Sequence, residues 1–269
     1  MTTCDVVERA LKKGKGGEVE AGSKLAILLS LQLADPENIY KELKGLLVQM
    51  LTDKTESAGS RAALANTLSG LCFMGGGEMA EVVSVMTSLE SVFSGSYNKA
   101  DHTPDISSLH AACVSGWSLL LSLQSPGEVH RLAQDNVIKK FELLLLSNDV
   151  DIRINAGEAI ALILEFAYDY DEVNSMKTLF VHLYAILQEF EPENLDKLIQ
   201  TVKQLATDST KSRSKKDRKE QRSSFRDILR AVEEGDPPNE KVKFGQEVLY
   251  IDSWYKKLQY DWFCKVKHL

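Results

Sequence analysis

The residues best suited to chemistry in this sequence are basic side chains gathered near its C-terminal end. Lysine and arginine neutralise phosphate groups, so this stretch could bind RNA with an affinity that falls as salt rises. A basic run is also typical of a nuclear-import signal, or simply of a solvated helix face, and the sequence leaves these readings open. The candidate residues are Lys211, Arg213, Lys215, Lys216, Arg218, Lys219, Arg222, Arg226 and Arg230.

Other patterns that could do chemistry are incomplete. Residues 17–24 resemble a phosphate-binding loop, but the final pair, Ser23-Lys24, is in the reverse of the order that such a loop needs. His110 and Cys113 are spaced for one helical turn, whereas a metal site needs three or four ligands. The five histidines are scattered, so no nucleophile, base and orienting acid can be assembled. We therefore expect no enzyme, no metal, no cofactor and no small-molecule substrate.

The charge is divided unevenly along the chain. Residues 1–210 hold 17 Lys and Arg against 29 Asp and Glu, and residues 211–269 hold 15 against 10. An acidic body with a basic end can present that end to a nucleic acid or to an acidic partner. We expect the function to lie toward the C-terminal third.

Composition predicts a soluble globular protein. Of the 269 residues, 43% are apolar and 26% are charged, which is enough to bury a core. No apolar stretch approaches the roughly 20 residues of a bilayer-spanning helix, and the N-terminus lacks a signal-peptide pattern. The four cysteines are far apart without a CxxC pair, so we expect reduced core thiols and a cytoplasmic and nuclear location.

Helical patterns fill the first 210 residues. Proline with an acid in the first turn, at Pro36, Pro126 and Pro192, is typical of a helix start, because the missing amide hydrogen costs nothing there and the helix dipole favours the acid. Leucine, alanine, glutamate and lysine dominate the segments between polar joints. The expected helices cover 3–13, 18–34, 36–51, 57–73, 78–93, 105–123, 127–147, 150–168, 173–190 and 192–207.

A weak internal repeat predicts how these helices pack. Ala21, Ala62, Ala111 and Ala156 each lie near the start of an apolar helix, at spacings of 41, 49 and 45 residues. Such spacings are typical of HEAT and armadillo repeats, whose small residues let neighbouring helices approach closely. We predict an all-α, armadillo/HEAT-like α-solenoid of four or five helix pairs with a small C-terminal helical and extended cap. The alternative is a non-repetitive helical bundle.

The C-terminal part has a different pattern. Residues 208–222 contain no apolar side chain, which predicts a linker or a charged helix extension. Phe225, Ile228, Leu229 and Val232 then form one helical stripe that Gly235 ends. An extended segment from 243 precedes a helix capped at Asp252 or Ser253, and the aromatic residues of 250–263 could stack on bases or form the core of a cap. The expected domains are 1–208, a basic linker or helix extension at 209–222, and a C-terminal region at 223–269 that looks truncated.

Several segments together resemble one known family. The segment QRSSFRDILRAVE at 221–233 is the longest, and ERALKKGK at 8–15, DIRINAGE at 151–158 and LATD at 205–208 precede it in order. The likeness continues through 243–245 and 250–254. The chain thus resembles the interferon-related developmental regulator family over nearly its whole length.

The resemblance implies a helical-repeat protein without catalytic activity. Family members are linked to co-repressor complexes that contain histone deacetylases during differentiation, and some are linked to idle ribosomes whose translation they repress. Members usually extend further at both ends, so contacts made by their C-terminal part are not carried over. Residues 170–191 look like an insertion relative to the family pattern.

Two functions follow from the charge pattern and the resemblance. The leading hypothesis is a scaffold that binds ribosomes or other ribonucleoprotein through the basic residues and represses translation. The alternative is a nuclear transcriptional co-regulator that docks co-repressor proteins, in which the basic block directs nuclear import. No membrane contact is expected, and the sequence does not indicate an oligomeric state.

Overall fold

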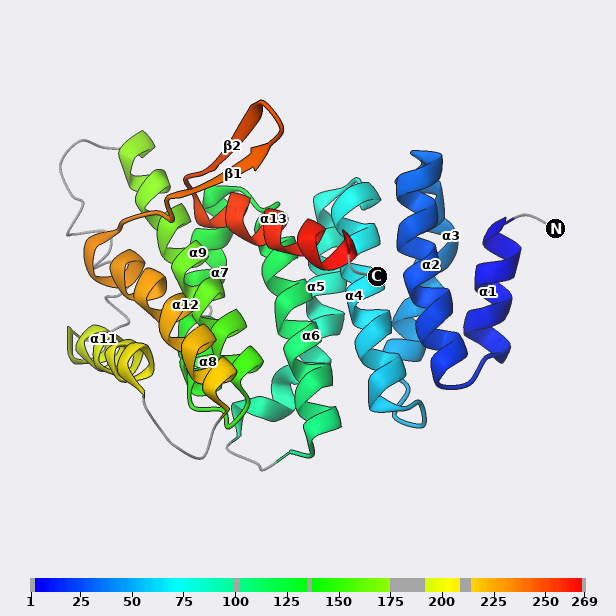
Figure 1. Cartoon of the computed structure of the whole chain (residues 1–269), viewed down its shortest axis with the longest axis horizontal. Coiled ribbons are helices and arrows are strands. Elements are labelled where there is room, and N and C mark those ends of the chain that lie inside the picture. The colour runs from blue at the N-terminus through cyan, green and yellow to red at the C-terminus, as the bar shows by residue number, and fades with distance from the viewer. Residues whose placement is uncertain (1–2, 99–101, 135–136, 175–191, 209–213, 268–269) are drawn as a thin grey trace. The chain divides into compact units, whose positions relative to one another are not determined.

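A computed structural model describes residues 3–98, 102–134, 137–174, 192–208 and 214–267. The N-terminal helices in it are α1 (Thr3–Lys13), α2 (Gly17–Leu33), α3 (Pro36–Thr52), α4 (Ala58–Gly75), α5 (Met79–Phe93) and α6 (Pro104–Leu121), with a 3-10 turn at Ser94–Tyr97. The following elements are α7 (Pro126–Gln134), α8 (Val137–Leu145), α9 (Val150–Asn174), α11 (Pro192–Thr207), α12 (Lys215–Glu234), β1 (Glu240–Phe244), β2 (Glu247–Ile251) and α13 (Trp254–Lys267) (Figure 1). None of the described helices combines the length and apolarity needed to cross a membrane.

The helix starts follow from local chemistry. Pro36, Pro104, Pro126 and Pro192 each open a helix, where proline's fixed φ is already helical. Ser57 caps α4 by accepting a hydrogen bond from the Ser60 amide at 3.0 Å. These signals explain why the expected helices and the observed ones agree to within a few residues over most of the chain.

The chain divides into two compact units by its contacts. Unit 1 comprises residues 1–123 and 260–269, and unit 2 comprises residues 124–259. Helix α12 runs without a break across the expected domain boundary at 222–223. The expected division into 1–208, 209–222 and 223–269 stays a prediction.

Unit 1 is a stack of helices in two layers. Helices α2, α4 and α6 pack on one another in succession, while α3 packs on α4 and α5 packs on α6 (Figure 1). The end of α13 covers this stack, where Trp262 and Val266 join Ile27 and Leu119 in the core. Trp262 lies so close to Gly70 that a Cβ there would be 2.4 Å from its ring. The layered stack is that of an α-solenoid, which confirms the predicted fold class.

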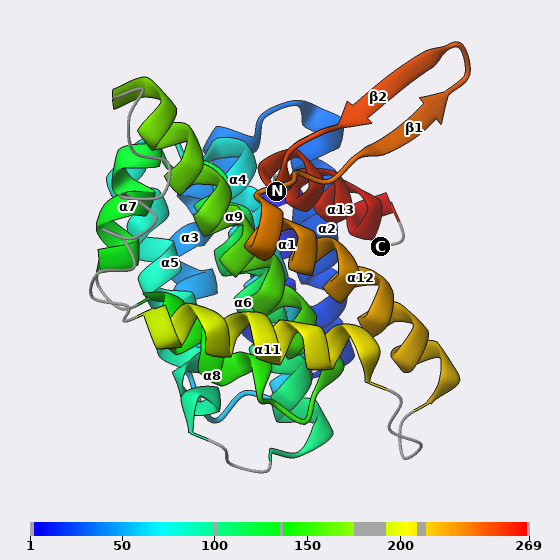
Figure 2. The same ribbon diagram turned by 90° about the vertical axis from the view of Figure 1, so that its left-hand side faces the viewer.

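Unit 2 is built around α9. Helices α7, α8 and α12 pack on α9, and α11 packs on α12, as Figure 2 shows for the α11 and α12 pair. The β1–β2 hairpin follows α12, with Glu240 opposite Ile251 and Phe244 opposite Glu247. The extended segment predicted from residue 243 is therefore the second half of a hairpin that begins at Glu240.

Some of the expected elements lie partly outside the described residues. Residues 127–147 form α7 and α8 with 135–136 outside the described residues, and the helix expected at 173–190 lies outside them from 175 onward, as does most of the proposed insertion. The count of four or five helix pairs depends on that segment and stays a prediction.

Only some of the alanines that mark the repeat lie where helices pack closely. Ala111 and Ala156 are buried, whereas Ala21 is exposed and Ala62 is only half-buried. Glycine supplies the tighter approach: a Cβ on Gly157 would lie 2.8 Å from Ile228 Cδ1. Ala21 and Ala62 therefore do not supply the close helix contact expected of them, because an alanine at a helix start need not face the neighbouring helix.

Candidate functional site

Most of the basic residues singled out in the sequence lie on α12. The seven from Lys215 to Arg230 belong to this helix, and Lys211 and Arg213 lie outside the described residues. Ser214 caps the helix by accepting the Asp217 amide at 3.1 Å, and Gly235 ends it with a left-handed φ of 71°. The stretch at 215–222 is thus a helix extension rather than a linker.

One face of α12 is anchored in the core of unit 2. Phe225, Ile228 and Val232 are buried at helical spacing. Phe225 and Ile228 both lie against Gly157 of α9, whose missing side chain lets the two helices approach closely. This anchoring fixes which side of α12 faces solvent.

A buried arginine also holds α12 in position. Arg153 of α9 is 1% exposed, and its Nε and Nη2 donate to Gln221 Oε1 at 3.1 and 2.6 Å. Its Nη1 donates to the Ser147 carbonyl at 2.5 Å. Gln221 Nε2 in turn donates to the Leu205 carbonyl of α11 at 3.1 Å. A single glutamine side chain thus connects α9, α11 and α12.

The exposed side of α12 carries a line of positive charge. Five basic residues follow one another at intervals of four, three, four and four, which places them along one helix face. We call this face the cationic stripe, and it consists of Lys215, Lys219, Arg222, Arg226 and Arg230. At 1.5 Å per residue it is about 22 Å long. Asp217, Glu220, Asp227 and Glu234 lie on other sides of the helix, whereas Glu233 falls on the face of the stripe and is ion-paired with Lys203.

The two lysines at the start of α12 destabilise the helix through its dipole. Lys215 and Lys216 are exposed in its first turn, where the helix dipole favours acids. Each misplaced cation costs about 0.3–1 kcal/mol by this effect. A solvated face selected only for stability would carry its lysines at the other end.

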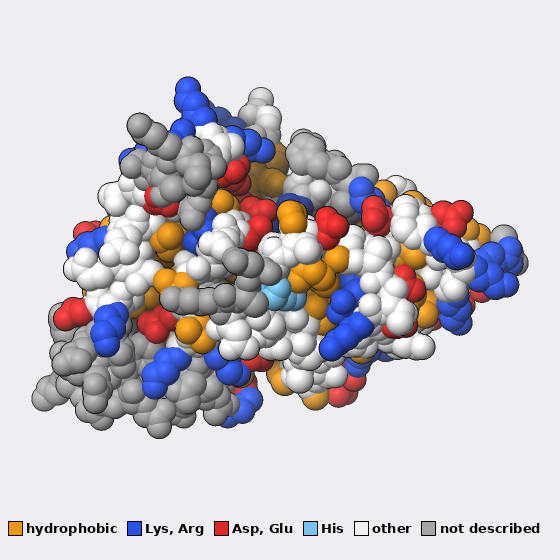
Figure 3. Space-filling view, turned by 90° about the horizontal axis from the view of Figure 1, so that it is seen from below, with side chains coloured by type: hydrophobic (Ala, Val, Ile, Leu, Met, Phe, Trp, Pro, Cys, Tyr) orange, Lys and Arg blue, Asp and Glu red, His pale blue; other side chains and the backbone are white. Residues whose placement is uncertain are grey.

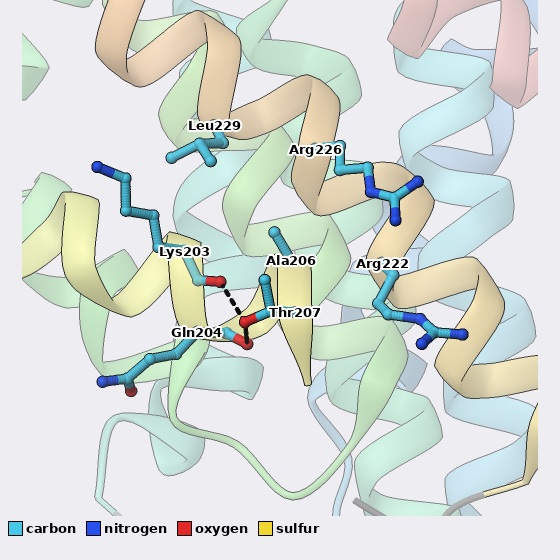
Figure 4. A pocket seen from close by; sticks show the side chains of 7 residues that line it. All are labelled: Lys203, Gln204, Ala206, Thr207, Arg222, Arg226 and Leu229. Atoms are coloured by element: carbon cyan, nitrogen blue, oxygen red, sulfur yellow. Dashed lines mark hydrogen bonds between the residues drawn. The ribbon is translucent and has the colours of Figure 1, made fainter. Parts of the chain in front are cut away.

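An open hollow of about 570 Å³ lies between α11 and α12 beside the stripe. Figure 4 shows the Arg222 and Arg226 side chains together on one side of it and Lys203 of α11 on the other. Ala206, Thr207 and Leu229 lie between them, and Thr207 Oγ1 donates to the Lys203 carbonyl at 2.9 Å. The hollow is therefore lined by both apolar and basic side chains, and the charged ends of Arg222 and Arg226 point away from Lys203 (Figure 4).

These cations differ in how far carboxylates neutralise them. Lys203 is ion-paired with Glu233, and Arg230 is paired with Asp227 at 2.6 Å. Arg222 Nε donates to the Arg218 carbonyl at 3.1 Å, and no carboxylate is paired with Arg222 or Arg226 within the described ranges. Two like charges one turn apart repel each other by a few tenths of a kcal/mol. An anionic ligand would relieve that repulsion.

Lys203 is a member of this site that sequence reasoning missed. It lies 19 residues before Arg222 and on a different helix. No spacing rule connects two helices in this way, and only the packing of α11 on α12 brings the two side chains to one hollow.

The aromatic residues of 250–263 were expected either to stack on bases or to form the core of a cap, and they include both buried and exposed side chains. Trp254 and Trp262 are buried, whereas Tyr250 and Phe263 are 54% and 45% exposed. The two tryptophans are therefore core, and only a minority of the group is open to a ligand.

The patterns considered for catalysis have structural roles where they are described. Residues 17–24 lie within α2 rather than in a loop. His110 Nδ1 is 2.6 Å from Ser96 Oγ in the interior, and burial raises the pKa of the Cys113 thiol to about 12. In the described part of the chain no three His, Cys, Asp or Glu side chains come together to hold a metal ion. Among the described residues on the face drawn in Figure 3, basic and acidic side chains are interspersed over much of the surface, and several basic side chains gather at its upper edge.

Comparison with known proteins decides the family. A family model described as interferon-related developmental regulator matches residues 1–233. The chain belongs to this family. It is 38% identical over 274 aligned residues to human interferon-related developmental regulator 1, covering 99% of this chain and 57% of that protein. It is 36% identical to mouse interferon-related developmental regulator 2, covering 99% of this chain and 58% of that protein.

This family membership confirms the resemblance seen in the sequence and supports a role as a developmental regulator. The chain spans little more than half the length of these relatives, at 57% and 58%. Among solved structures, a designed armadillo repeat protein is similar, with a TM-score of 0.41 and 11% identity, covering 85% of this chain and all of that one.

Proposed function

We propose that this member of the interferon-related developmental regulator family is a non-enzymatic helical-repeat scaffold that binds ribonucleoprotein, the ribosome in particular, and represses translation. The cationic stripe on α12 is the observation that carries the proposal, and the resemblance supplies the ribosome and the repression. The protein acts in the cytoplasm under this proposal and enters the nucleus under the alternative below.

The stripe suits a polyanion better than a single small anion. Five cations in a line of about 22 Å match an extended run of phosphates rather than one group. The hollow beside the stripe is also lined by Arg222 and Arg226, whose side chains lie on the same side of it (Figure 4). Anion binding would also offset the unfavourable position of Lys215 and Lys216 against the helix dipole.

A second candidate function is a nuclear co-regulator that docks co-repressor proteins containing histone deacetylases. The observation that favours it is a line of exposed leucines on α2, at Leu25, Leu28 and Leu31, which are 38%, 43% and 44% exposed. Apolar side chains exposed along one helix are typical of a protein-binding surface. In this case the basic residues would direct nuclear import.

The test of the leading proposal is sedimentation with purified ribosomes through sucrose gradients at about 0.1 M and about 0.5 M salt. Five phosphate contacts predict a loss of affinity on the order of a thousandfold across this range. The test variant carries Lys215→Glu, Lys219→Glu and Arg226→Glu, whose side chains are all exposed. The control carries Lys13→Glu, Lys24→Glu and Lys54→Glu, an equal charge change at exposed sites elsewhere.

We expect the wild type and the control to co-sediment at low salt only, and the test variant not to co-sediment. Equal sedimentation of the test variant would overturn the stripe as the binding site. Absence of association for the wild type at both salt concentrations would overturn the ribosome proposal. Loss of nuclear accumulation by the test variant, with co-repressor capture retained, would support the alternative.

A further inference from the structure

The β1–β2 hairpin is largely exposed to solvent. Of its ten strand residues only Ile251 is buried, and Figure 2 shows the hairpin extending away from α12. Phe244 and Tyr250 are 55% and 54% exposed, and Val248 and Leu249 are each 40% exposed. Large apolar side chains gathered at such an extended element indicate a contact surface.

The hairpin is nevertheless held firmly at its base. Ile251 and Pro238 are buried there, and Lys257 of α13 donates to Glu240 at 3.1 Å. At the tip, Gly245 has a φ of 60°, which allows a two-residue turn between the strands. A lone two-stranded hairpin is only marginally stable in water, so this anchoring keeps the strands in place.

The strand register divides the side chains between two faces of different chemistry. Directly opposed residues share a face, and residues two apart along a strand share it as well. Val242, Phe244 and Leu249 therefore lie on one face together with Glu247. The other face, which we call the tyrosine–lysine face, consists of Lys241, Lys243, Val248 and Tyr250.

The tyrosine–lysine face carries positive charge and an aromatic ring but no carboxylate. Lys241 Nζ lies 5.3 Å from the centre of the Tyr250 ring. The acids of the hairpin, Glu240 and Glu247, both lie on the opposite face, and Glu240 is already paired with Lys257. Lys241 and Lys243 are two residues apart on one strand, so their side chains leave the sheet about 6.8 Å from each other.

This combination fits one class of ligand. Proteins that bind single-stranded nucleic acids combine cations that follow the phosphate backbone with aromatic rings on which bases stack. An apolar protein surface packed on this face would instead need mostly apolar side chains, and two of the four side chains on the face are lysines.

We propose that the tyrosine–lysine face binds single-stranded RNA, with a base stacked on Tyr250 and phosphates contacted by Lys241 and Lys243. The inference rests on the proposed function, because it supplies a second contact with the RNA of a ribonucleoprotein. It differs from the cationic stripe in its chemistry, since stacking adds affinity that salt does not remove.

The test is fluorescence anisotropy of the whole chain with a fluorescein-labelled twelve-nucleotide oligouridine. Tyr250→Ser should weaken binding by about 5- to 150-fold, as expected when one stacking ring is lost. Tyr250→Phe should bind as the wild type does, because its ring remains. Phe244→Ser, on the opposite face with similar exposure, is the matched control and should bind unchanged. Circular dichroism checks that each variant is folded.

The same titration with the Lys215, Lys219 and Arg226 variant separates this inference from the proposed function. If that variant loses binding while Tyr250→Ser retains it in full, the hairpin inference is overturned and the stripe stands. That result would favour a protein as the ligand of the hairpin. If Tyr250→Ser alone weakens binding, the inference is supported and the stripe fails. The hairpin inference is also overturned if the wild type does not bind the oligonucleotide.

Discussion

Replacing Gln221 should destabilise unit 2 more than any other single polar change on α12. The side chain accepts two hydrogen bonds from the buried Arg153 guanidinium, at 3.1 and 2.6 Å, and donates one to the Leu205 carbonyl at 3.1 Å. A hydrogen bond to a charged group contributes about 1.5–3 kcal/mol, and a neutral one about 1 kcal/mol. Because both guanidinium bonds share one acceptor, we expect Gln221→Ala to lower the free energy of unfolding by about 3 kcal/mol.

The measurement is guanidinium-induced unfolding followed by circular dichroism at 222 nm, together with thermal unfolding. A loss of about 3 kcal/mol corresponds to a fall in Tm of roughly 6–12 °C for a chain of this size. Ser223→Ala is the control, because Ser223 is exposed two residues further along the same helix. It should change the free energy by less than about 0.5 kcal/mol.

Gln221→Met separates hydrogen bonding from packing, since methionine has a similar size and no polar end. If the hydrogen bonds matter, this variant should also lose about 2 kcal/mol or more. The reasoning is refuted if Gln221→Met unfolds as the wild type does, or if Gln221→Ala costs no more than the Ser223 control.

Three further predictions concern other parts of the chain. Glu165→Ala should lower the free energy of unfolding by about 1 kcal/mol, because its carboxylate accepts two amides at the start of α13, at 2.6 and 3.4 Å. Ser253→Ala should have no such cost, as its buried Oγ makes no hydrogen bond, and equal losses in denaturant titrations would contradict this. Burial lowers the pKa of His110 from 6.5 to about 4, so the unfolded state takes up the proton first. Stability should therefore fall by up to about 3 kcal/mol as the pH drops from 6.5 to 4, and a His110→Gln variant with an unchanged pH profile would count against it. With DTNB at pH 8, half-buried Cys264 should react before Cys113, whose thiol pKa burial raises to about 12; simultaneous labelling in the native state would disagree.

The local part of the fold could be predicted from the sequence. Helix starts at Pro36 and Pro192 and the helix end at Gly235 depend on the backbone properties of single residues, which act wherever these residues occur. Helical spacing predicted that Phe225, Ile228, Leu229 and Val232 form the apolar face of α12. Three of them are buried, whereas Leu229 is half-buried and lines the hollow.

What could not be predicted depends on contacts between distant segments. Capping of α13 was expected from Asp252 or Ser253, but the acceptor is Glu165, 89 residues before the first amide that it binds. Arg153 and Gln221 are 68 residues apart, and the sequence around either residue gives no sign that the two side chains form a hydrogen bond. In the candidate site, the α12 residues follow from helical spacing, whereas Lys203 joins them only through packing.

The return of α13 to unit 1 has a consequence for how the protein folds as it is made. Residues 260–269 belong with residues 1–123, and Trp262 and Val266 complete a core that also contains Ile27 and Leu119. During synthesis from the N-terminus, domains generally fold as soon as their residues are available. Here the surface of α4 at Gly70 stays uncovered until almost the whole of unit 2 has been translated. Until α13 has been made, the N-terminal helices therefore keep an apolar surface that is open to chaperones.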